Sequence, residues 1–192
     1  MKAKYIYGLI FFSVCSFQTS AQELLRWGIK FGLDIPSNQK DFTEVWTYKS
    51  TFNYNIGFQL RVGGRLYAHT GLDYHINKCK LNFIDSTTQL HSIELGYVSL
   101  PLQFGYHLVE GRNVSLRFLT GLQYRTLVRL TKNDIGLLKS NMQIHNMDLL
   151  AGLGLDLYSF TFDVGYRKSF QAIIPNSEHY RDMLTLSLGL IF

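Results

Sequence analysis

The sequence predicts an all-β fold: an eight-stranded antiparallel up-and-down transmembrane β-barrel with a polar, filled interior. Three observations support this prediction. Apolar residues alternate with polar residues or glycine in eight separate runs, and short and long connections alternate between those runs. Aromatic residues make up 15% of the 192-residue chain, which favours strands. The last run, LTLSLGLIF at 184–192, shows the alternation without any charged residue.

The N-terminal segment has the features of an export signal. Lys2 and Lys4 precede an apolar run, and small residues end the segment at Ala21, where a signal peptidase would cleave. We therefore expect a signal peptide at 1–21 and a single β-barrel domain at 22–192. The apolar run is shorter than the roughly 20 residues of a membrane-spanning helix. Cleavage would leave one of the two cysteines in the mature chain, too few for an internal disulfide.

The eight runs are defined by their period of two. In the first run the odd positions are apolar from Leu25 to Ile35, and the even positions carry charge or glycine. The same pattern recurs with one apolar face in each of the other runs. The runs lie at 25–35, 52–62, 66–76, 92–108, 114–125, 149–157, 160–167 and 184–192.

The run at 92–108 changes its apolar parity. Ile93, Leu95 and Tyr97 are odd, whereas the apolar positions from Leu102 onward are even. One extra residue would explain the change, because a β-bulge shifts the parity and proline cannot donate a hydrogen bond to a neighbouring strand. We therefore expect a bulge near Pro101.

The connections fall into two classes. Gly63-Gly64, 110–113 and 158–159 are short enough for tight turns. The long connections lie at 36–51, 77–90, 131–141 and 171–181. Short and long connections alternate strictly, and every second connection of an up-and-down barrel lies at the same end. All long connections should therefore share one rim.

Two architectures close eight antiparallel strands through hairpins: a soluble calyx of the lipocalin type and an outer-membrane barrel. Glycines are frequent on the polar face. They would weaken an exposed strand face, but they leave room for long side chains inside a narrow barrel. The large apolar side chains of nearly every strand would overfill such an interior, so we expect them to contact lipid. Aromatic girdles are expected from Trp27, Tyr106, Phe160 and Phe192 at the short-turn end, and from Phe52, Tyr54, Tyr74, Tyr166 and Phe170 at the other.

The segment YVSLPLQFGY at 97–106, the export signal, the eight runs and the terminal Phe192 together resemble PorT-like small outer-membrane β-barrels of the OmpA/OmpX type. This resemblance implies a location in the cell outer membrane. It also implies an alternative role as an accessory component of a protein secretion system, with which the named member of the group is associated. The last strand, ending in Phe192, is similar to the signal read by the barrel-assembly machinery, which is therefore an expected partner.

The polar face predicts a lumen lined by ionisable residues of both signs. Buried charges must be paired and hydrogen-bonded, so Arg–Asp networks should fill the lumen, and a barrel of eight strands encloses no wide aqueous channel. The expected inward residues are Arg26, Lys30, Asp34, Arg61, Arg65, His69, Asp73, His75, His107, Arg117, Arg125, Arg129, Asp148, Asp156, Asp163 and Arg167.

The same face raises the question of catalysis. Asp73 could orient His75 as a general base near the long-loop rim, but no motif selects a serine among Ser140, Ser169 and Ser177. A lipid A-modifying barrel enzyme is therefore the less favoured alternative. We expect no enzymatic activity and no catalytic, cofactor-binding or metal site.

The long connections carry lysines among polar and aromatic residues. These lysines are Lys40, Lys49, Lys78, Lys80, Lys132 and Lys139. They suit the phosphates of lipopolysaccharide, in addition to the outer-membrane lipid around the wall. The modest basic charge gives no indication of nucleic-acid binding. Because loops on a rigid scaffold are common binding sites, the rim is also a possible platform for a protein partner. The leading hypothesis is an integral outer-membrane protein with a structural or surface-interaction role.

Overall fold

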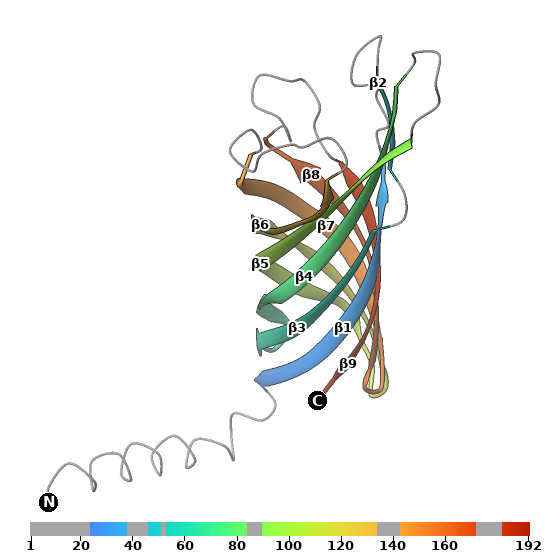
Figure 1. The fold of residues 1–192 in the computed structure, drawn as a ribbon. Coiled ribbons are helices and arrows are strands. Elements are labelled where there is room, and N and C mark those ends of the chain that lie inside the picture. Colours follow the sequence, from blue (N-terminus) through green and yellow to red (C-terminus); the bar gives the residue numbers. More distant parts are fainter. Residues whose placement is uncertain (1–23, 38–45, 51–52, 84–89, 134–142, 172–181) are drawn as a thin grey trace, which may run out of the picture.

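The computed structural model describes residues 24–37, 46–50, 53–83, 90–133, 143–171 and 182–192, which form nine β-strands (Figure 1). The strands are β1 (Leu25–Pro36), β2 (Trp46–Ser50), β3 (Asn53–Gly63), β4 (Leu66–Phe83), β5 (Leu90–Glu110), β6 (Val114–Asn133), β7 (His145–Leu157), β8 (Phe160–Ser169) and β9 (Met183–Ile191). Within these ranges, no helix is long and apolar enough to cross a membrane. The predicted signal peptide and Phe52 lie outside the described residues.

Eight of these strands close into an antiparallel barrel. Their order is β1-β3-β4-β5-β6-β7-β8-β9, and β9 pairs with β1 to complete the wall. Each barrel strand corresponds to one predicted run, so the predicted eight-stranded up-and-down fold is confirmed. The ninth strand, β2, lies within the first long connection and pairs with the end of β4. It was not predicted.

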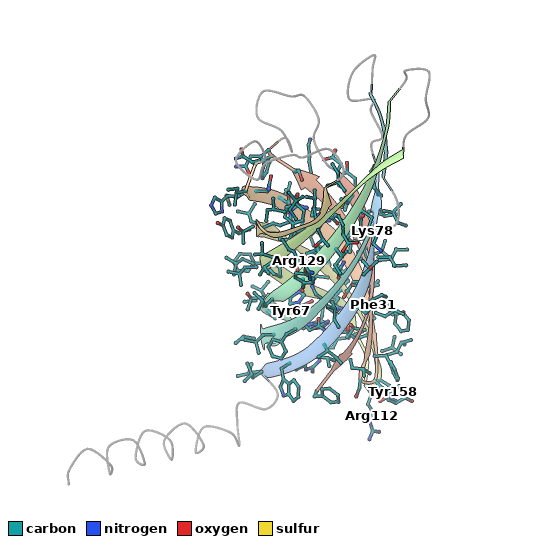
Figure 2. The ribbon with its side chains drawn as sticks, viewed as in Figure 1. Phe31, Tyr67, Lys78, Arg112, Arg129 and Tyr158 are labelled. Carbon is teal, nitrogen blue, oxygen red and sulfur yellow. The ribbon has the colours of Figure 1, made fainter. Side chains whose placement is uncertain are left out.

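The two faces of the wall have opposite chemistry, as the alternation predicts. Arg61 and Arg117 are 3% and 0% exposed, whereas Phe58 and Phe118 on the same strands are 44% and 40% exposed. Figure 2 shows the labelled Tyr67 and Phe31, which are 3% and 50% exposed respectively. Charged groups therefore fill the lumen and the apolar side chains form the outer surface, which identifies a transmembrane barrel and excludes the calyx.

Inward glycines make room for the large side chains of the lumen. A Cβ atom added at Gly105 would collide with the ring of Tyr67, and one added at Gly154 would collide with the Arg117 guanidinium. At the β3–β4 turn, Gly63 has a φ of 130°, which L side chains rarely adopt. The glycines therefore follow from the narrow interior and from one tight turn.

The predicted bulge near Pro101 is absent, and that expectation was wrong. Thr70 pairs with Leu102 and Asp73 pairs with Ser99 in the same register, so β5 keeps one parity along β4. Pro101 only interrupts the hydrogen-bond ladder, because it has no N–H, and its carbonyl oxygen accepts a 2.9 Å hydrogen bond from Thr70 Oγ1. The parity change in hydrophobicity has another cause.

That cause is an apolar layer on the inner face of the wall, at the long-loop rim and just beyond it. Ile93, Leu95 and Tyr97 on β5 are 2–4% exposed, and Leu127 and Met183 are buried as well. The apolar residues at these odd positions of β5 therefore point inward. The sequence pattern had predicted that they point outward.

Bulges do occur elsewhere, in both strands of the β5–β6 pair. The register between β5 and β6 shifts at three points along β5: between Ile93 and Glu94, between Gly96 and Tyr97, and between His107 and Val109. The second shift leaves Val128 as an extra residue on β6 and turns Arg129, labelled in Figure 2, to the outer face. Arg129 was predicted to point inward, and the bulge is the reason that prediction was wrong.

The short turns lie at the end of the barrel where Figure 2 shows Arg112 and Tyr158. Strands β3 and β4, β5 and β6, and β7 and β8 are each joined there by two or three residues, as predicted. The antiparallel order places the remaining connections at the opposite rim, which confirms the predicted separation of short and long connections.

Candidate functional site

An Arg–Asp network fills the short-turn half of the lumen. Asp156 on β7 accepts hydrogen bonds from Arg61 on β3 at 2.9 Å and from Arg117 on β6 at 3.0 Å. The second terminal nitrogen of Arg117 lies 2.6 Å from Asp163 on β8. Four strands are thus tied together, through three groups that are almost fully shielded from water and through Asp163, whose side chain is 20% exposed. Such a network fixes register, since each charge has an opposite partner.

A second network surrounds Asp34, which is fully buried on β1. Its carboxylate accepts a hydrogen bond from Thr185 Oγ1 at 2.7 Å and lies 3.1 Å from Arg167 and 2.8 Å from Nδ1 of His75. The other ring nitrogen of His75, Nε2, lies 2.9 Å from Ser99 Oγ.

The partners of His75 differ from those suggested by the sequence. Asp73 contacts Lys30 at 3.0 Å, so Asp34 orients the imidazole from another strand. The hydroxyl partner is Ser99, which was not among the candidates, while Ser169 donates to Asp148 at 2.6 Å. The other two candidates, Ser140 and Ser177, lie outside the described residues. The parity of β5 could have indicated Ser99, since it is odd and therefore inward.

Asp34, His75 and Ser99 have the contact order of a Ser-His-Asp triad. However, these three residues are at most 2% exposed, and Gln123 Nε2 also donates to Ser99 Oγ at 2.6 Å. An acyl substrate could not approach a hydroxyl that is enclosed in this way. The geometry therefore fits a structural hydrogen-bond chain across the lumen better than a nucleophilic site.

Arg125 and Asp148 connect the networks to the apolar layer. The guanidinium of Arg125 lies 3.3 Å from Asp148 and 5.0 Å from the centroid of the Tyr97 ring. Asp148 is fully buried. A cation between a carboxylate and an aromatic face is satisfied on both sides, so the polar and apolar parts of the lumen are packed as one unit.

Most of the predicted inward residues are confirmed. The buried ones are Asp34, Arg61, His69, Asp73, His75, His107, Arg117, Arg125, Asp148, Asp156 and Arg167, and Lys30 and Asp163 are half-buried. Arg26 is exposed at the short-turn mouth. Arg65 is also exposed and lies over the ring of Tyr106, on the outer side of that mouth, at 5.2 Å.

The described part of the barrel contains cavities, two of which are lined by charged residues of the lumen. One of about 90 Å³ is lined by Lys30, His69, Asp73 and Gln103 together with residues of the opposite wall. The other, of about 530 Å³, lies at the short-turn mouth between β1, β3, β4 and β5. Among the described residues, no three His, Cys, Asp or Glu side chains are grouped so that they could hold a metal ion.

Part of the wall extends past the long-loop rim. Strand β4 pairs with β3 only up to Ile76, but it continues for seven residues beside β5 and β2. Strand β6 pairs with β7 up to Thr126 and then continues beside β5 to Asn133. We call this part, formed by β2 with 77–83, 90–95 and 129–133, the protruding sheet. In Figure 1 it rises above the rest of the wall.

The protruding sheet has two open edges. Its strand order is β2-β4-β5-β6. In the described part of the chain, β2 pairs with β4 alone, and 129–133 of β6 pair with β5 alone. The backbone N–H and C=O groups on the outer side of such strands can pair with a further strand.

The outer surface is apolar along the whole barrel. Leu72, Leu102 and Phe104 are 57–67% exposed. Trp27 and Phe192 are in contact at the short-turn end, with ring centroids 5.2 Å apart, and Tyr166 and Phe170 are exposed near the other rim. An apolar band with aromatic residues near both ends matches the predicted lipid belt.

Solved structures of a Yersinia pestis protein are similar to this chain. One is the crystal structure of Ail, the attachment invasion locus protein of Yersinia pestis, in complex with the heparin analogue sucrose octasulfate. Its sequence is 14% identical to this chain, the match covers 88% of this chain and 99% of that one, and the TM-score is 0.44. The structure of Ail in a phospholipid bilayer nanodisc is also 14% identical, covering 87% and 99% with a TM-score of 0.40. No curated protein matches the chain.

The model of the outer membrane protein beta-barrel domain matches residues 18–174, which is most of the sequence. This match agrees with the closed antiparallel wall, the charged lumen and the apolar exterior described above. The chain therefore belongs to the outer membrane protein beta-barrel domain family.

Proposed function

We propose that this protein is a non-enzymatic outer-membrane barrel whose protruding sheet binds a protein partner at the cell surface. The observation that carries the proposal is the pair of open edges on a sheet that extends past the barrel rim. An extended segment of a partner could add to either edge, with backbone hydrogen bonds supplying affinity. The barrel itself would hold the sheet at a fixed height above the lipid.

The packed lumen supports this role over transport or catalysis. Paired charges occupy the interior from Asp34 to Asp156, and the enclosed triad-like contact at Ser99 has no access for a substrate. A barrel whose interior is filled by its own side chains is a rigid scaffold. The functional part of such a protein is then the protruding sheet, which extends past the barrel wall.

The edges carry a feature that restricts promiscuous pairing. Lys49 lies in β2 and Lys132 lies in the outer part of β6. A lysine on an edge strand disfavours unselective strand addition, because pairing with the edge of another sheet would remove the charge of the lysine from water. A partner would therefore need a complementary acidic segment, which gives the proposed interaction its selectivity.

A site-specific photo-crosslinker tests this proposal. Placed at Thr47 in β2 and at Thr131 in β6 of the full chain in intact cells, it should form an adduct with the same extracellular protein. Placed at Arg112 in a short turn at the opposite end, it should not. Absence of any adduct at both edges, or the same adduct at Arg112, would contradict the proposal.

A variant with a shortened protruding sheet provides the matched control. Lys80 and Ser92 are paired across β4 and β5, so 81–91 can be replaced by Asn-Gly, which closes a two-residue hairpin. The variant removes most of the β4 segment that pairs with β2 and keeps the barrel wall. It should retain heat-modifiable migration on gels and lose the adduct at Thr47, whereas the β6 edge, where Thr131 pairs with Glu94, is kept. An adduct of unchanged yield would place the partner elsewhere.

Export and assembly are part of the same proposal. We infer that the signal at 1–21 is cleaved after Ala21 and that the barrel-assembly machinery reads the last strand, ending in Phe192. N-terminal sequencing of the mature protein should begin at Gln22, and Phe192→Ala should reduce the amount recovered in the outer-membrane fraction. Lysines at the long-loop rim, including Lys78 over the Tyr54 ring, suit lipopolysaccharide phosphates.

Membership of the PorT-like group would add a secretion role. It rests on the sequence resemblance, namely the export signal, the eight runs, the YVSLPLQFGY segment and the terminal Phe192, and on no contact in the lumen or the protruding sheet. Deletion of the gene and measurement of exported cargo separates the two roles. Unchanged cargo would eliminate the secretion role without affecting the proposed surface interaction.

A further inference from the structure

The strand register gives the protruding sheet one charged face. Directly paired residues of an antiparallel sheet, and residues two positions apart on one strand, lie on the same face. Lys80 pairs with Lys49 on β2, and Lys78 pairs with Glu94 on β5. Gly96, two positions after Glu94, pairs with Arg129 on β6. We call this face, which carries Lys49, Lys78, Lys80, Glu94 and Arg129, the cationic face.

The opposite face of the sheet carries no Lys, Arg, Asp or Glu at its paired positions. The register assigns to it, among others, Trp46, Tyr48, Leu81, Ile93 and Leu95. Lys132 is the extra residue of a bulge, because Thr131 pairs with Glu94 and Asn133 pairs with Ile93. The paired charges therefore all lie on one face, with four cations against one carboxylate.

The cationic face contains a like-charge pair. Lys49 and Lys80 are direct partners across β2 and β4. Like charges in directly opposite positions destabilise an antiparallel pair of strands. Lys78 is two positions from Lys80, and its ammonium lies 3.9 Å from Glu94 in a pair whose side chains are 46% and 27% exposed. One solvated carboxylate does not balance this group, so a bound anion would relieve the repulsion.

Interfacial tyrosines fix the level at which the cationic face begins. The Lys78 ammonium lies 5.5 Å from the centroid of the Tyr54 ring. A Cβ atom added at Gly96 would lie 2.6 Å from the Tyr74 hydroxyl and 3.1 Å from Cβ of Arg129, so these two side chains are neighbours on the outer face. Tyrosines of this kind mark the boundary between hydrocarbon and head groups. The two cations therefore lie in the layer that contains the lipid phosphates.

We infer that the cationic face binds the phosphate groups of outer-leaflet lipid A. The face continues the lipid-facing surface of the wall, so it meets the head groups before any other anion. The inference rests on the proposed contact of the rim lysines with lipopolysaccharide, and it names the residues and the face that make this contact. It does not involve the strand edges, whose backbone groups stay available to a protein partner.

Native mass spectrometry of the full barrel tests the inference. The protein is placed in phosphatidylcholine nanodiscs that contain a minor fraction of lipid A, and the lipid A molecules retained on its release are counted. A parallel set of nanodiscs contains lipid A with the same acyl chains but without phosphates. The phosphorylated form should be retained at least about fivefold more, since each Lys or Arg near an anionic surface contributes about that factor. Equal retention of the two forms would overturn the inference.

Three variants assign the retention to the cationic face. Arg129→Gln and Lys78→Gln should each lower it by about fivefold. Arg65→Gln is the matched control, because Arg65 is also exposed and lies over an outward ring, that of Tyr106, but at the opposite end of the barrel. It should change the retention by less than about twofold. Equal losses for Arg65→Gln and Arg129→Gln would overturn the inference.

A crosslinker at Thr47 separates this inference from the proposed protein partner. Heat-modifiable migration first identifies the folded variants. Loss of lipid A retention in Arg129→Gln, with the Thr47 adduct unchanged, supports the inference whatever the partner is. Loss of the adduct with unchanged lipid A retention would overturn it, because the cationic face would then bind an acidic protein. Absence of any adduct in the wild-type protein contradicts only the edge pairing.

Discussion

Arg61 on β3 and Asp156 on β7 are 95 positions apart in the sequence, and their side chains meet at 2.9 Å. In the closed strand order β1-β3-β4-β5-β6-β7-β8-β9, these two strands stand on opposite sides of the barrel. The ion pair therefore crosses the lumen. Contacts of this kind hold the two halves of the wall at a fixed distance, in addition to the hydrogen bonds between neighbouring strands.

Removal of Arg117 should strongly destabilise the barrel. Arg117→Leu leaves Asp163 without its 2.6 Å partner and Asp156 with one partner of two. Removing one member of a buried ion pair typically costs about 3–5 kcal/mol. Urea unfolding followed by tryptophan fluorescence measures the change. Arg112→Leu, in an exposed turn, should stay within about 0.5 kcal/mol, and equal losses for the two variants would show that the network adds no stability.

A charge on the outer face should be tolerated according to its depth. Leu72 lies midway along the barrel part of β4 and Leu66 is its first residue, and both are exposed on the outer face. Leu72→Arg should lower the free energy of unfolding in lipid vesicles by about 2–4 kcal/mol, and Leu66→Arg by about 0–1 kcal/mol. The same loss at both positions would be inconsistent with a lipid-facing belt.

An added methyl group in the lumen should have a different effect from one in a turn. Gly105→Ala places its Cβ against the Tyr67 ring, so the ring or the strand must move. Overpacking of this kind costs about 1–3 kcal/mol. Gly64→Ala meets no atom within 4 Å and should be nearly neutral. Both values come from the same urea titration, and an equally neutral Gly105→Ala would mean that the lumen is loosely packed.

Ser99 should be unreactive despite its contact with His75. The hydroxyl is 1% exposed and already hydrogen-bonded to Gln123 and His75. A fluorophosphonate probe should therefore leave the folded protein unlabelled, as judged by intact mass. Labelling of the wild-type protein that disappears in Ser99→Ala would reveal an accessible nucleophile and contradict the proposed non-enzymatic role.

The sequence predicted the wall of this barrel well. Alternation along a strand is a local property with a period of two, so the faces of β1 or β9 could be assigned without knowing their neighbours. The tight turns at Gly63-Gly64 and at 158–159 were equally local. Inward placement of Arg61, Arg117 and Asp156 followed directly from parity.

The interior contacts required the tertiary structure. Parity placed Asp73 and His75 on one face, but the partner of His75 is Asp34 on a strand two positions away in the wall, and its second contact is Ser99. Such contacts depend on the stagger of the strands around the barrel, which hydrophobic alternation does not encode.

By itself, the sequence determined that eight strands, each with one apolar and one polar face, would form a closed barrel. Only the tertiary structure decided that Ile93, Leu95 and Tyr97 turn inward, that the bulge at Val128 exposes Arg129, and that β2 joins the protruding sheet. The physical reason is that a lumen can bury apolar as well as paired polar groups. Hydrophobicity alone therefore does not reveal which way a side chain points where both faces of the wall exclude water.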